Sequence, residues 1–212
     1  MRMRKKQWAE PFLEENQDFV MMNPETLAGT WKQILNCNEL HVEIGSGKGD
    51  YIAGMAAMDR SVGWVGIEKE HNVAAVAVKK LLESDHQNIR FIAQDAAQFE
   101  NWFAPHEIDV IHLNFSDPWP KSGYKKRRLS HRGFLEKYAN ALSSQGKVIM
   151  KTDNCTLFEF SLIEFADCGW KLIDVSVDFR RNPHDEDTIT EYERRFMDLG
   201  QPIYRAIWQK NG

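Results

Sequence analysis

The chain has 212 residues, of which 42% are apolar and 27% are charged, as is ordinary for a soluble globular protein. Its formal net charge is −4, so a nucleic-acid partner cannot be argued from overall charge and would need a local cluster of basic residues. No apolar stretch reaches the ~18 residues of a membrane-spanning helix, and none follows the basic N-terminus as in a signal peptide. We therefore expect one large domain with small extensions and no membrane partner.

The cysteines and histidines show no recognisable site. Cys37, Cys155 and Cys168 are widely spaced and form neither a CxxC pair nor a disulfide framework, which is typical of the reducing cytoplasm. The seven histidines show no HExxH or similar ligand spacing. We therefore predict a cytoplasmic protein without a metal site.

Residues 1–38 are expected to form a basic arm and a docking helix ahead of a main domain at residues 39–212. Four of the first six residues are basic, Arg2 and Arg4 among them, so the arm is a candidate RNA contact; a frayed, solvated terminus is the alternative. Asn23-Pro24 predicts the start of a short helix. The side chains expected to dock this segment are Trp8, Phe12, Leu13 and Phe19.

A strand, a glycine loop and a helix follow in the order that positions an adenosyl cofactor. LHVEI is strand-like, GSGKG is the loop, and an apolar periodic helix begins at Tyr51. A dinucleotide fingerprint would read G-x-G-x-x-G, but position 50 is Asp50. We interpret Gly45 and Gly47 as allowing close approach of S-adenosylmethionine, and Glu43 as an acid that faces its positive charge. A glycine-rich turn without a ligand is the alternative.

Two further acids stand where successive strands end. GWVGI ends at Glu68, where a carboxylate can accept hydrogen bonds from both hydroxyls of a ribose. IRFIA is followed by Asp95, which could accept from an adenine amine while Ala96 leaves room for the ring. A solvated acid is the alternative for Glu68, and an N-cap of a helix at residues 96–102 is the alternative for Asp95.

The fourth strand, residues 108–115, leads into a turn and a basic segment. Two prolines stiffen the turn SDPWP, in which Asp117 supplies a hydrogen-bond acceptor and Trp119 a flat face for stacking. An acceptor, a ring and a basic segment at a strand end suit a nucleobase that is still attached to a polymer. A proline-rich turn and a solvated basic loop is the alternative. The basic residues are Lys121, Lys125, Lys126, Arg127 and Arg128.

Four apolar strands separated by helices predict an α/β fold with a parallel sheet that is covered by helices on both faces. In such sheets, ligands bind beyond the carboxyl ends of the strands, where the strand order reverses. Glu43, Glu68, Asp95 and Asp117 all lie at or just past such ends. Their coincidence predicts a single site.

The rest of the chain continues the alternation of helices and strands. Asp153, after the fifth strand, could cap the next helix or accept from a substrate. The polar stretch 179–188 is expected to be a mobile loop. A last strand at 202–208 is expected to be antiparallel, at the far side of the sheet. The other elements expected are helices at 72–84, 129–142 and 156–166 and strands at 146–150 and 171–177.

TEYE, residues 190–193, opens the helix after that loop. Thr190 and Glu193 have capping-box spacing, Glu191 and Arg195 are spaced as an i,i+4 pair, and Gly200 is a natural stop. The segment therefore has a structural explanation from its own residues.

NFSDPWPK followed by KKRR resembles the signature of the bacterial tRNA (guanine-N7)-methyltransferases. The N-terminal R-x-R, EIGSGKG, KTDN, TEYE and GQPIYR are also similar to that family, so the resemblance covers nearly the whole chain. It implies a Rossmann-like, S-adenosylmethionine-dependent methyltransferase fold with a seven-stranded, mostly parallel sheet and an antiparallel last strand. It also implies tRNA as partner and a variable-loop guanine as target. Ser122-Gly123-Tyr124 stands where the family usually has more basic residues.

The resemblance also implies roles for individual residues. S-adenosylmethionine would be bound by Glu43, Gly45, Gly47, Glu68, Asp95, Ala96 and Asp117. Guanine or RNA would be contacted by Lys121, Asp153, Thr190, Glu191, Tyr192 and Glu193. The tRNA would further touch Gly123, Tyr124, Lys125, Lys126, Arg127 and Arg128, together with Arg2 and Arg4.

Guanine N7 carries a free lone pair, so its methylation needs no general base. The ring becomes cationic, and we expect Asp117 to orient the guanine or stabilise that charge. Asp153 and Glu193 would accept from the N1–H and 2-amino edge. A nicotinamide-dependent oxidoreductase would need the other glycine spacing, a small-molecule methyltransferase has no use for the basic segment, and an RNA-binding module would not need four acids at strand ends. A monomer and a homodimer both remain compatible with the sequence.

Overall fold

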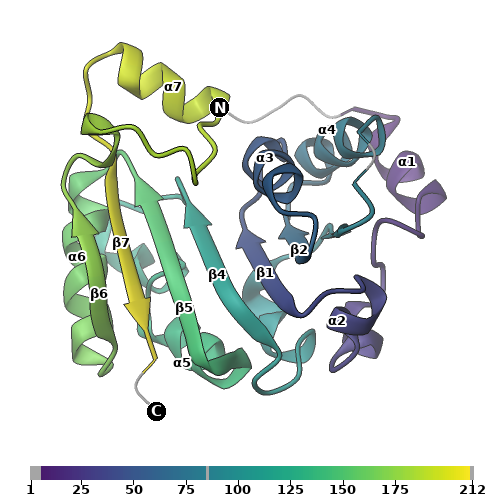
Figure 1. The fold of residues 1–212 in the computed structure, drawn as a ribbon, viewed down its shortest axis with the longest axis horizontal. Helices are drawn as coiled ribbons and strands as arrows, with labels where there is room; N and C mark the ends of the chain where they lie inside the picture. Colours follow the sequence, from purple (N-terminus) through teal and green to yellow (C-terminus); the bar gives the residue numbers. More distant parts are fainter. Residues whose placement is uncertain (1–5, 85, 211–212) are drawn as a thin grey trace.

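A seven-stranded sheet runs through the centre of the computed structural model, which describes residues 6–84 and 86–210 (Figure 1). The strands are β1 Glu39–Ile44, β2 Val62–Ile67, β3 Ile89–Ile92, β4 Ile108–Asn114, β5 Leu142–Thr152, β6 Lys171–Ser176 and β7 Tyr204–Gln209. Their order is β3-β2-β1-β4-β5-β7-β6. β1 to β5 pair in parallel, whereas β7 runs antiparallel to both β5 and β6. The seven-stranded, mostly parallel sheet expected from the sequence is confirmed.

β7 lies on the side of the sheet away from β3, as expected, but the edge position there belongs to β6. It pairs with β5 on one side and with the edge strand β6 on the other. Ala206 and Trp208 of β7 are 0% and 1% exposed, whereas Leu172 of β6 is 43% exposed. Ala206 and Trp208 point to the face that α6 covers, where Trp208 stacks on Phe165 at 3.9 Å, and the more exposed strand β6 forms the edge.

Helices cover both faces of the sheet, as expected (Figure 1). α3 (Asp50–Met58) and α4 (His71–Leu82) cover one face, and α5 (Arg132–Ala141) and α6 (Cys155–Asp167) cover the other. α7 (Glu191–Asp198) lies above the upper ends of β4 and β5 in Figure 1. The shorter helices are α1 Ala9–Glu15 and α2 Trp31–Ile34, with 3₁₀ turns η1 Pro24–Leu27, η2 Ala96–Asn101, η3 Ser122–Arg127 and η4 Phe179–Arg181. Within the described residues, no helix combines the length and the apolar character needed to cross a membrane.

Each face of the sheet has its own hydrophobic core. Trp64 of β2 packs in a cluster with residues of α3 and α4, and the next residue, Val65, packs in a second cluster with residues of α5 and α6. Successive strand side chains point to opposite faces, so both residues are buried. This two-sided burial is why the central strands consist of continuous apolar runs.

The N-terminal segment packs on the same body as the rest of the chain. Leu13 and Phe19 are buried, as expected, and Val20 forms an isolated parallel bridge with β3. Phe12 is partly buried and packs against the core, as expected. Trp8 is 41% exposed, so the expectation that it docks the segment is wrong; its ring lies 5.6 Å from the ring of Phe12. The domain boundary at residue 38 stays a prediction, and Arg2 and Arg4 lie outside the described residues.

Two helix starts differ from expectation. Asn23 precedes the single 3₁₀ turn η1 and makes no side-chain cap there. At α6 the cap is Asn154 rather than Asp153, because Asn154 Oδ1 accepts from the N–H of Leu157 at 2.8 Å. Asp153 precedes the N-cap position, which leaves its carboxylate for another role.

Residues 179–188 are anchored to the body, against the expectation of a mobile loop. Phe179 begins η4, is 3% exposed and donates its N–H to the carbonyl of Ile203 at 2.7 Å. Asp187 is 7% exposed although it is an acid. The polar composition of this stretch therefore reflects buried ion pairs, which are described below.

Candidate active site

The carboxyl ends of the parallel strands border a cavity of about 570 Å³. It lies where the strand order reverses between β1 and β4, which is the ligand position in open α/β sheets. Five residues expected to bind a cofactor line it together: Gly45, Glu68, Asp95, Ala96 and Asp117. The other lining residues are Ile44, Ile67, Lys69, Gln94, Ala97, Phe115, Ser116, Trp119, Lys126, Arg127, Leu129 and Phe134.

The glycine loop turns sharply at the rim of this cavity. Gly45, Gly47 and Gly49 have φ angles of +82°, +54° and +76°, which residues with a side chain rarely adopt. The N–H of Gly45 donates to the carbonyl of Ile67 at 2.8 Å, which ties the loop to the end of β2. A Cβ on Gly45 or Gly47 would meet no atom within 4 Å and would project into open space. The glycines therefore form the turn and keep the space beside it free.

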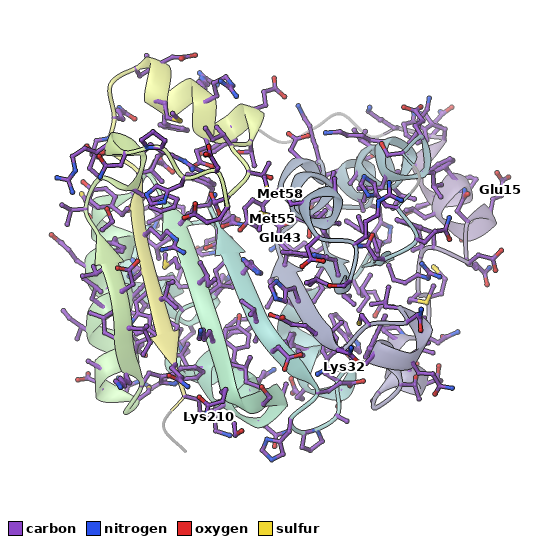
Figure 2. The ribbon with its side chains drawn as sticks, in the orientation of Figure 1. Glu15, Lys32, Glu43, Met55, Met58 and Lys210 are labelled. Carbon is purple, nitrogen blue, oxygen red and sulfur yellow. The ribbon has the colours of Figure 1, made fainter. Side chains whose placement is uncertain are left out.

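Glu43 lies near the upper end of β1 and is 2% exposed (Figure 2). Asn114 of β4 donates from Nδ2 to Glu43 Oε1 at 2.9 Å, while Oε2 has no hydrogen-bond partner among the described residues. Burial raises the pKa of Glu43 to about 7, against the opposing effects of the Asn114 hydrogen bond and the Lys151 charge. A buried carboxylate with an unpaired oxygen can accept from a ligand or face a cation.

Glu68 and Asp95 follow β2 and β3 at the cavity. Glu68 accepts from the N–H of Gly47 at 3.1 Å and from that of Glu70 at 2.9 Å, which fixes its carboxylate beside the glycine loop. Burial raises the pKa of Glu68. Asp95 accepts from the N–H of Ala97 at 2.9 Å and caps η2, so the capping alternative is correct and coexists with its place at the cavity.

The turn after β4 holds Asp117 between two residues with unusual backbone geometry. Phe115 and Trp119 have φ angles of +51° and +41°, and for bulky side chains such angles are strained. The N–H of Phe115 donates to the carbonyl of Lys151 at 2.8 Å, which ties the turn to β5. Asp117 is exposed at the cavity. The guanidinium of Arg127 lies 5.0 Å from the Trp119 ring, so a cation and an aromatic face meet at the rim.

Arg128 supports this turn from inside the protein. It is 4% exposed, and its guanidinium donates to the carbonyls of Pro118 at 2.9 Å and Trp119 at 3.2 Å. The expectation that Arg128 touches RNA is not supported by this placement, because its donors are turned inward. The other members of the basic segment are exposed: Lys121, Gly123, Tyr124, Lys125, Lys126 and Arg127.

The residues expected to contact the substrate fall into two groups. Lys121, Glu191 and Tyr192 are exposed, and Asp153 is half-buried with a pKa that burial raises. Thr190 instead caps α7 by accepting from the N–H of Glu193 at 3.0 Å, as the capping-box spacing predicts. The ring of Tyr192 lies 5.1 Å from that of Phe115, so α7 reaches the turn after β4.

A family model described as "Putative methyltransferase" matches residues 37–206. The chain is 42% identical over 207 residues to the tRNA (guanine-N(7)-)-methyltransferase of Streptococcus agalactiae serotype III (strain NEM316), covering 97% of this chain and 98% of that protein. It is 43% identical over 207 residues to the enzyme of that name from Bacillus subtilis (strain 168), covering 97% of each chain. The chain belongs to the tRNA (guanine-N(7)-)-methyltransferase family. The family that the sequence motifs resemble is therefore confirmed.

Solved structures confirm the fold of this tRNA (guanine-N(7)-)-methyltransferase family member. An antibiotic-related methyltransferase superposes with a TM-score of 0.63 at 16% identity, covering 84% of this chain and 92% of that chain. A 16S rRNA methyltransferase, KamB, superposes with a TM-score of 0.62 at 14% identity, covering 85% and 92%. At such low identity the likeness concerns the fold alone, which is the Rossmann-like methyltransferase fold expected from the sequence.

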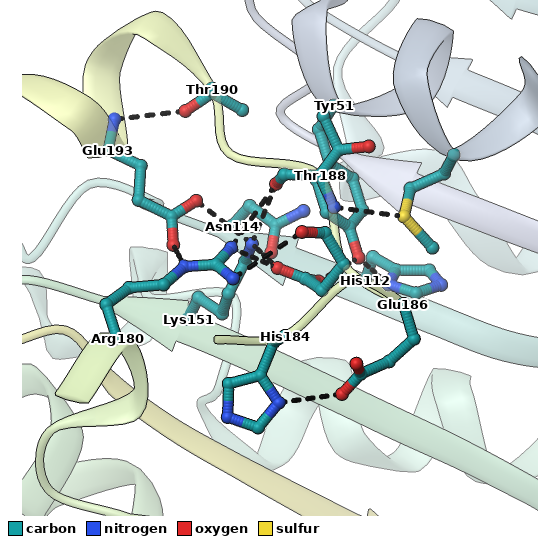
Figure 3. Close-up of polar contacts among 12 residues, drawn as sticks. Tyr51, His112, Asn114, Lys151, Arg180, His184, Glu186, Thr188, Thr190 and Glu193 are labelled. Atoms are coloured by element: carbon teal, nitrogen blue, oxygen red, sulfur yellow. Dashed lines mark hydrogen bonds and ion pairs between the residues drawn. The ribbon is translucent and has the colours of Figure 1, made fainter. Parts of the chain in front are cut away.

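This family member also contains a buried ionic group that sequence reasoning missed (Figure 3). Lys151 Nζ lies 2.6 Å from Asp187 Oδ2 and 3.1 Å from Glu193 Oε2. Arg180 pairs with the same two acids, through Nη2 with Asp187 and through Nε with Glu193 at 2.6 Å. Lys151, Arg180, Asp187 and Glu193 are referred to below as the four-charge cluster. One feature of the sequence could have indicated the cluster: the lysine of KTDN follows directly on an apolar strand. A lysine at such a position is buried, and a buried charge needs partners of opposite charge.

The cluster changes the interpretation of Glu193. Its side chain is 0% exposed, and its two oxygens accept from Lys151 and Arg180. The direct contact with a guanine edge expected of Glu193 is not supported by this placement, because no carboxylate oxygen faces solvent. The expected i,i+4 partner of Glu191 also differs: Lys48 of the glycine loop lies 3.6 Å from Glu191.

The remaining sequence expectations concern metals and cysteines. Among the described residues, no three His, Cys, Asp or Glu side chains are grouped so that they could hold a metal ion. Cys37, Cys155 and Cys168 are all free thiols.

Proposed function

We propose that this protein transfers a methyl group from S-adenosylmethionine to N7 of a guanine in the variable loop of tRNA. Membership of the tRNA (guanine-N(7)-)-methyltransferase family supports the reaction. One structural observation carries the proposal: a single cavity is lined by Gly45, Glu68 and Asp117 and also by the basic residues Lys126 and Arg127. A cofactor position and a surface for RNA phosphates are thus contiguous.

The cavity fits S-adenosylmethionine in its size and in its donor and acceptor groups. Gly45 and Glu68 line the cavity, whereas Glu43, which has an unpaired buried oxygen, and Gly47 lie two residues to either side of Gly45 in the chain, outside that lining. Gly45 and Gly47 leave open space where side chains would project, and Glu68 accepts from the N–H of Gly47. We assign the binding of the cofactor to these residues together with Asp95, Ala96 and Asp117. When bound, S-adenosylmethionine supplies an electrophilic methyl group on a sulfonium.

The protein's part in the chemistry is to position groups and stabilise charge. Guanine N7 has a free lone pair, so no side chain has to remove a proton. The methylated ring is cationic, and the exposed carboxylate of Asp117 would orient the base and favour that charge. Asp153 and Tyr192 would complete the guanine site, Asp153 as an acceptor for the N1–H and 2-amino edge and Tyr192 as an aromatic neighbour.

The tRNA itself would bind through phosphates. Lys121, Lys125, Lys126 and Arg127 are exposed around the turn after β4, and Gly123 and Tyr124 lie in the same segment. The N-terminal Arg2 and Arg4 remain proposed contacts that lie outside the described residues. We further propose that the reaction takes place in the cytoplasm, needs no metal, and is carried out by a monomer or a homodimer.

The test is methyl transfer from radiolabelled S-adenosylmethionine to unmodified tRNA transcripts, followed by cleavage chemistry selective for N7-methylguanine. Label at one variable-loop guanine is expected, and a transcript with adenine at that position should remain unlabelled. Label at another guanine would overturn the target within tRNA. A protein that binds the cofactor but labels no transcript would overturn the choice of substrate.

A further inference from the structure

The four-charge cluster joins segments that are far apart in the sequence. Lys151 is the second-last residue of β5, Arg180 belongs to η4, Asp187 lies in the following loop and Glu193 lies in α7 (Figure 3). Each cation contacts both acids, and the exposed fraction of every side chain is at most 7%. Two positive and two negative charges balance, so the group is neutral as a unit.

The four-charge cluster supplies the buried part of the attachment of α7. Glu193 is the only residue of α7 that is buried, and Leu199, just past the helix, is 63% exposed. Most surface helices are held by an apolar stripe. In α7, Phe196 and Met197 are only half-buried, Tyr192 contacts Phe115 and Glu191 pairs with Lys48, and the one buried side chain is a carboxylate that is bound to two cations. For stability alone, well-packed apolar residues at these positions would serve as well or better, because burying four charges costs desolvation free energy.

The loop before α7 is pressed against the helix that follows the glycine loop. A Cβ on Gly54 of α3 would come closer to Thr188 than real Cβ atoms ever do, so only glycine allows this approach. Tyr51 of α3 donates from its hydroxyl to Asp187 Oδ1 at 2.9 Å. Residues 187–193 are therefore fixed between the cofactor side of the cavity and the ends of β4 and β5.

We propose that Lys151, Arg180 and Asp187 are positioning residues for methyl transfer, which fix α7 and its first turn at the site where the guanine binds. The proposal rests on the proposed function. With Glu193 they set Tyr192 against Phe115 and hold Thr190 at the start of α7. A displacement of about 1 Å at such a site can lower the rate by about 100-fold. Loss of the cluster should therefore lower the rate of tRNA methylation and leave the affinity for the cofactor unchanged.

The test compares three variants of the full-length protein with a matched control. Asp187→Asn weakens the cluster, Arg180→Met with Asp187→Asn removes one charge of each sign, and Arg180→Lys keeps the cation. The control is Glu107→Gln, which changes another buried carboxylate to an amide. Glu107 accepts from the N–H groups of Gly29 and Trp31 at 2.9 Å each, near the opposite ends of the strands.

We measure kcat and KM for tRNA, the Kd for S-adenosylmethionine, the melting temperature and the amide hydrogen exchange of residues 188–198. The double variant should lose about 10-fold to 100-fold in kcat/KM for tRNA, with a Kd for S-adenosylmethionine within about twofold of the wild type and faster exchange in α7. Arg180→Lys should recover part of the loss. The control should melt earlier and keep the wild-type kcat/KM.

Gly54→Ala provides a second test that leaves every charge in place. The new methyl group should displace Thr188, lower kcat/KM for tRNA and speed exchange in α7 while the protein stays folded. Wild-type kcat/KM in the folded double variant would overturn the inference, as would a loss of cofactor affinity in proportion to kcat/KM. If the wild type transfers no methyl group to tRNA, the proposed function itself fails. This outcome is distinct from a failure of the positioning proposal, because it is seen with the wild type before any variant is compared.

Discussion

Asp117 is the residue on which the proposed chemistry depends most directly. Its side chain is exposed at the cavity, so Asp117→Ala should leave the melting temperature nearly unchanged. We expect single-turnover methyl transfer to fall by about 100-fold or more, the typical effect of removing one electrostatic stabiliser of a transition state. Asp117→Asn, which keeps the shape and loses the charge, separates charge stabilisation from hydrogen bonding. Near-normal transfer by a folded Asp117→Ala protein would exclude Asp117 from the mechanism.

Glu43 should make the stability of the cofactor-free protein depend on pH. Burial raises its pKa from 4.5 to about 7, so between these values the folded state holds a proton that the unfolded state releases. The stability contributed by protonated Glu43 is complete below about pH 4.5 and is lost as the pH rises through about 7. Glu43→Gln stays neutral, so calorimetry should find it more stable than the wild type by about 1–3 kcal/mol at about pH 8 and nearly equal at about pH 4. The same stability difference at both pH values would show that Glu43 is not perturbed by burial.

The sequence predicted single residues well where their role depends on local order. An acid directly after an apolar run lies at a strand end whatever the rest of the chain does, so the places of Glu68, Asp95 and Asp117 at the cavity were predicted, and their roles stay predictions. The burial of Arg128 and Glu193 was not foreseen, because it depends on residues that are not their close neighbours in the sequence. The carbonyl that holds Arg128 is 10 residues away, and the lysine that holds Glu193 is 42 residues away.

The start of α6 gives a prediction at the scale of an element, because neighbouring residues have separate roles there. Asn154 caps the helix through the N–H of Leu157, whereas Asp153 is half-buried without capping it. Asn154→Ala should therefore lower the free energy of unfolding by about 1 kcal/mol, as measured by urea titration. Asp153→Ala should leave that free energy nearly unchanged and lower kcat/KM for tRNA. If Asp153→Ala instead lowered the free energy of unfolding and kept kcat/KM, Asp153 would be the helix cap, and the guanine edge would lose its proposed acceptor.

The existence of each helix and strand was predicted more reliably than its position relative to the other elements. The apolar period locates each strand, but it does not state which strand lies beside it. β7 was therefore recognised as antiparallel and on the far side of the sheet, whereas its place between β5 and β6 was not predicted. The polar stretch 179–188 was wrongly expected to be mobile for a related reason. Its residues Arg180 and Asp187 are charged, which is typical of an exposed loop, but the fold buries them as ion pairs.

At the scale of the whole molecule, a protein with a net charge of −4 has to attract a polyanion. The exposed cations beside the cavity, Lys125, Lys126 and Arg127, offer a local positive surface that the net charge hides. Each phosphate contact releases counterions, so the affinity for tRNA should fall steeply as salt concentration rises. The dependence on salt thus reports how many phosphates are bound, and variants can locate them.

Replacing Lys125, Lys126 and Arg127 together with alanine should weaken tRNA binding and reduce the slope of log affinity against log salt by about 2–3, since each contact contributes about 0.7–0.9. The matched control replaces Lys147, Lys171 and Lys210 with alanine and so removes the same charge elsewhere. Lys147 and Lys171 both pair with Gln209 of β7, and Lys210 is the next residue. Lys210 lies far below Glu43 in Figure 2. Filter binding at several salt concentrations should find the control slope unchanged. Equal losses in both triple variants would show that overall charge attracts the tRNA, and the basic segment would then lose its role as the phosphate-binding surface.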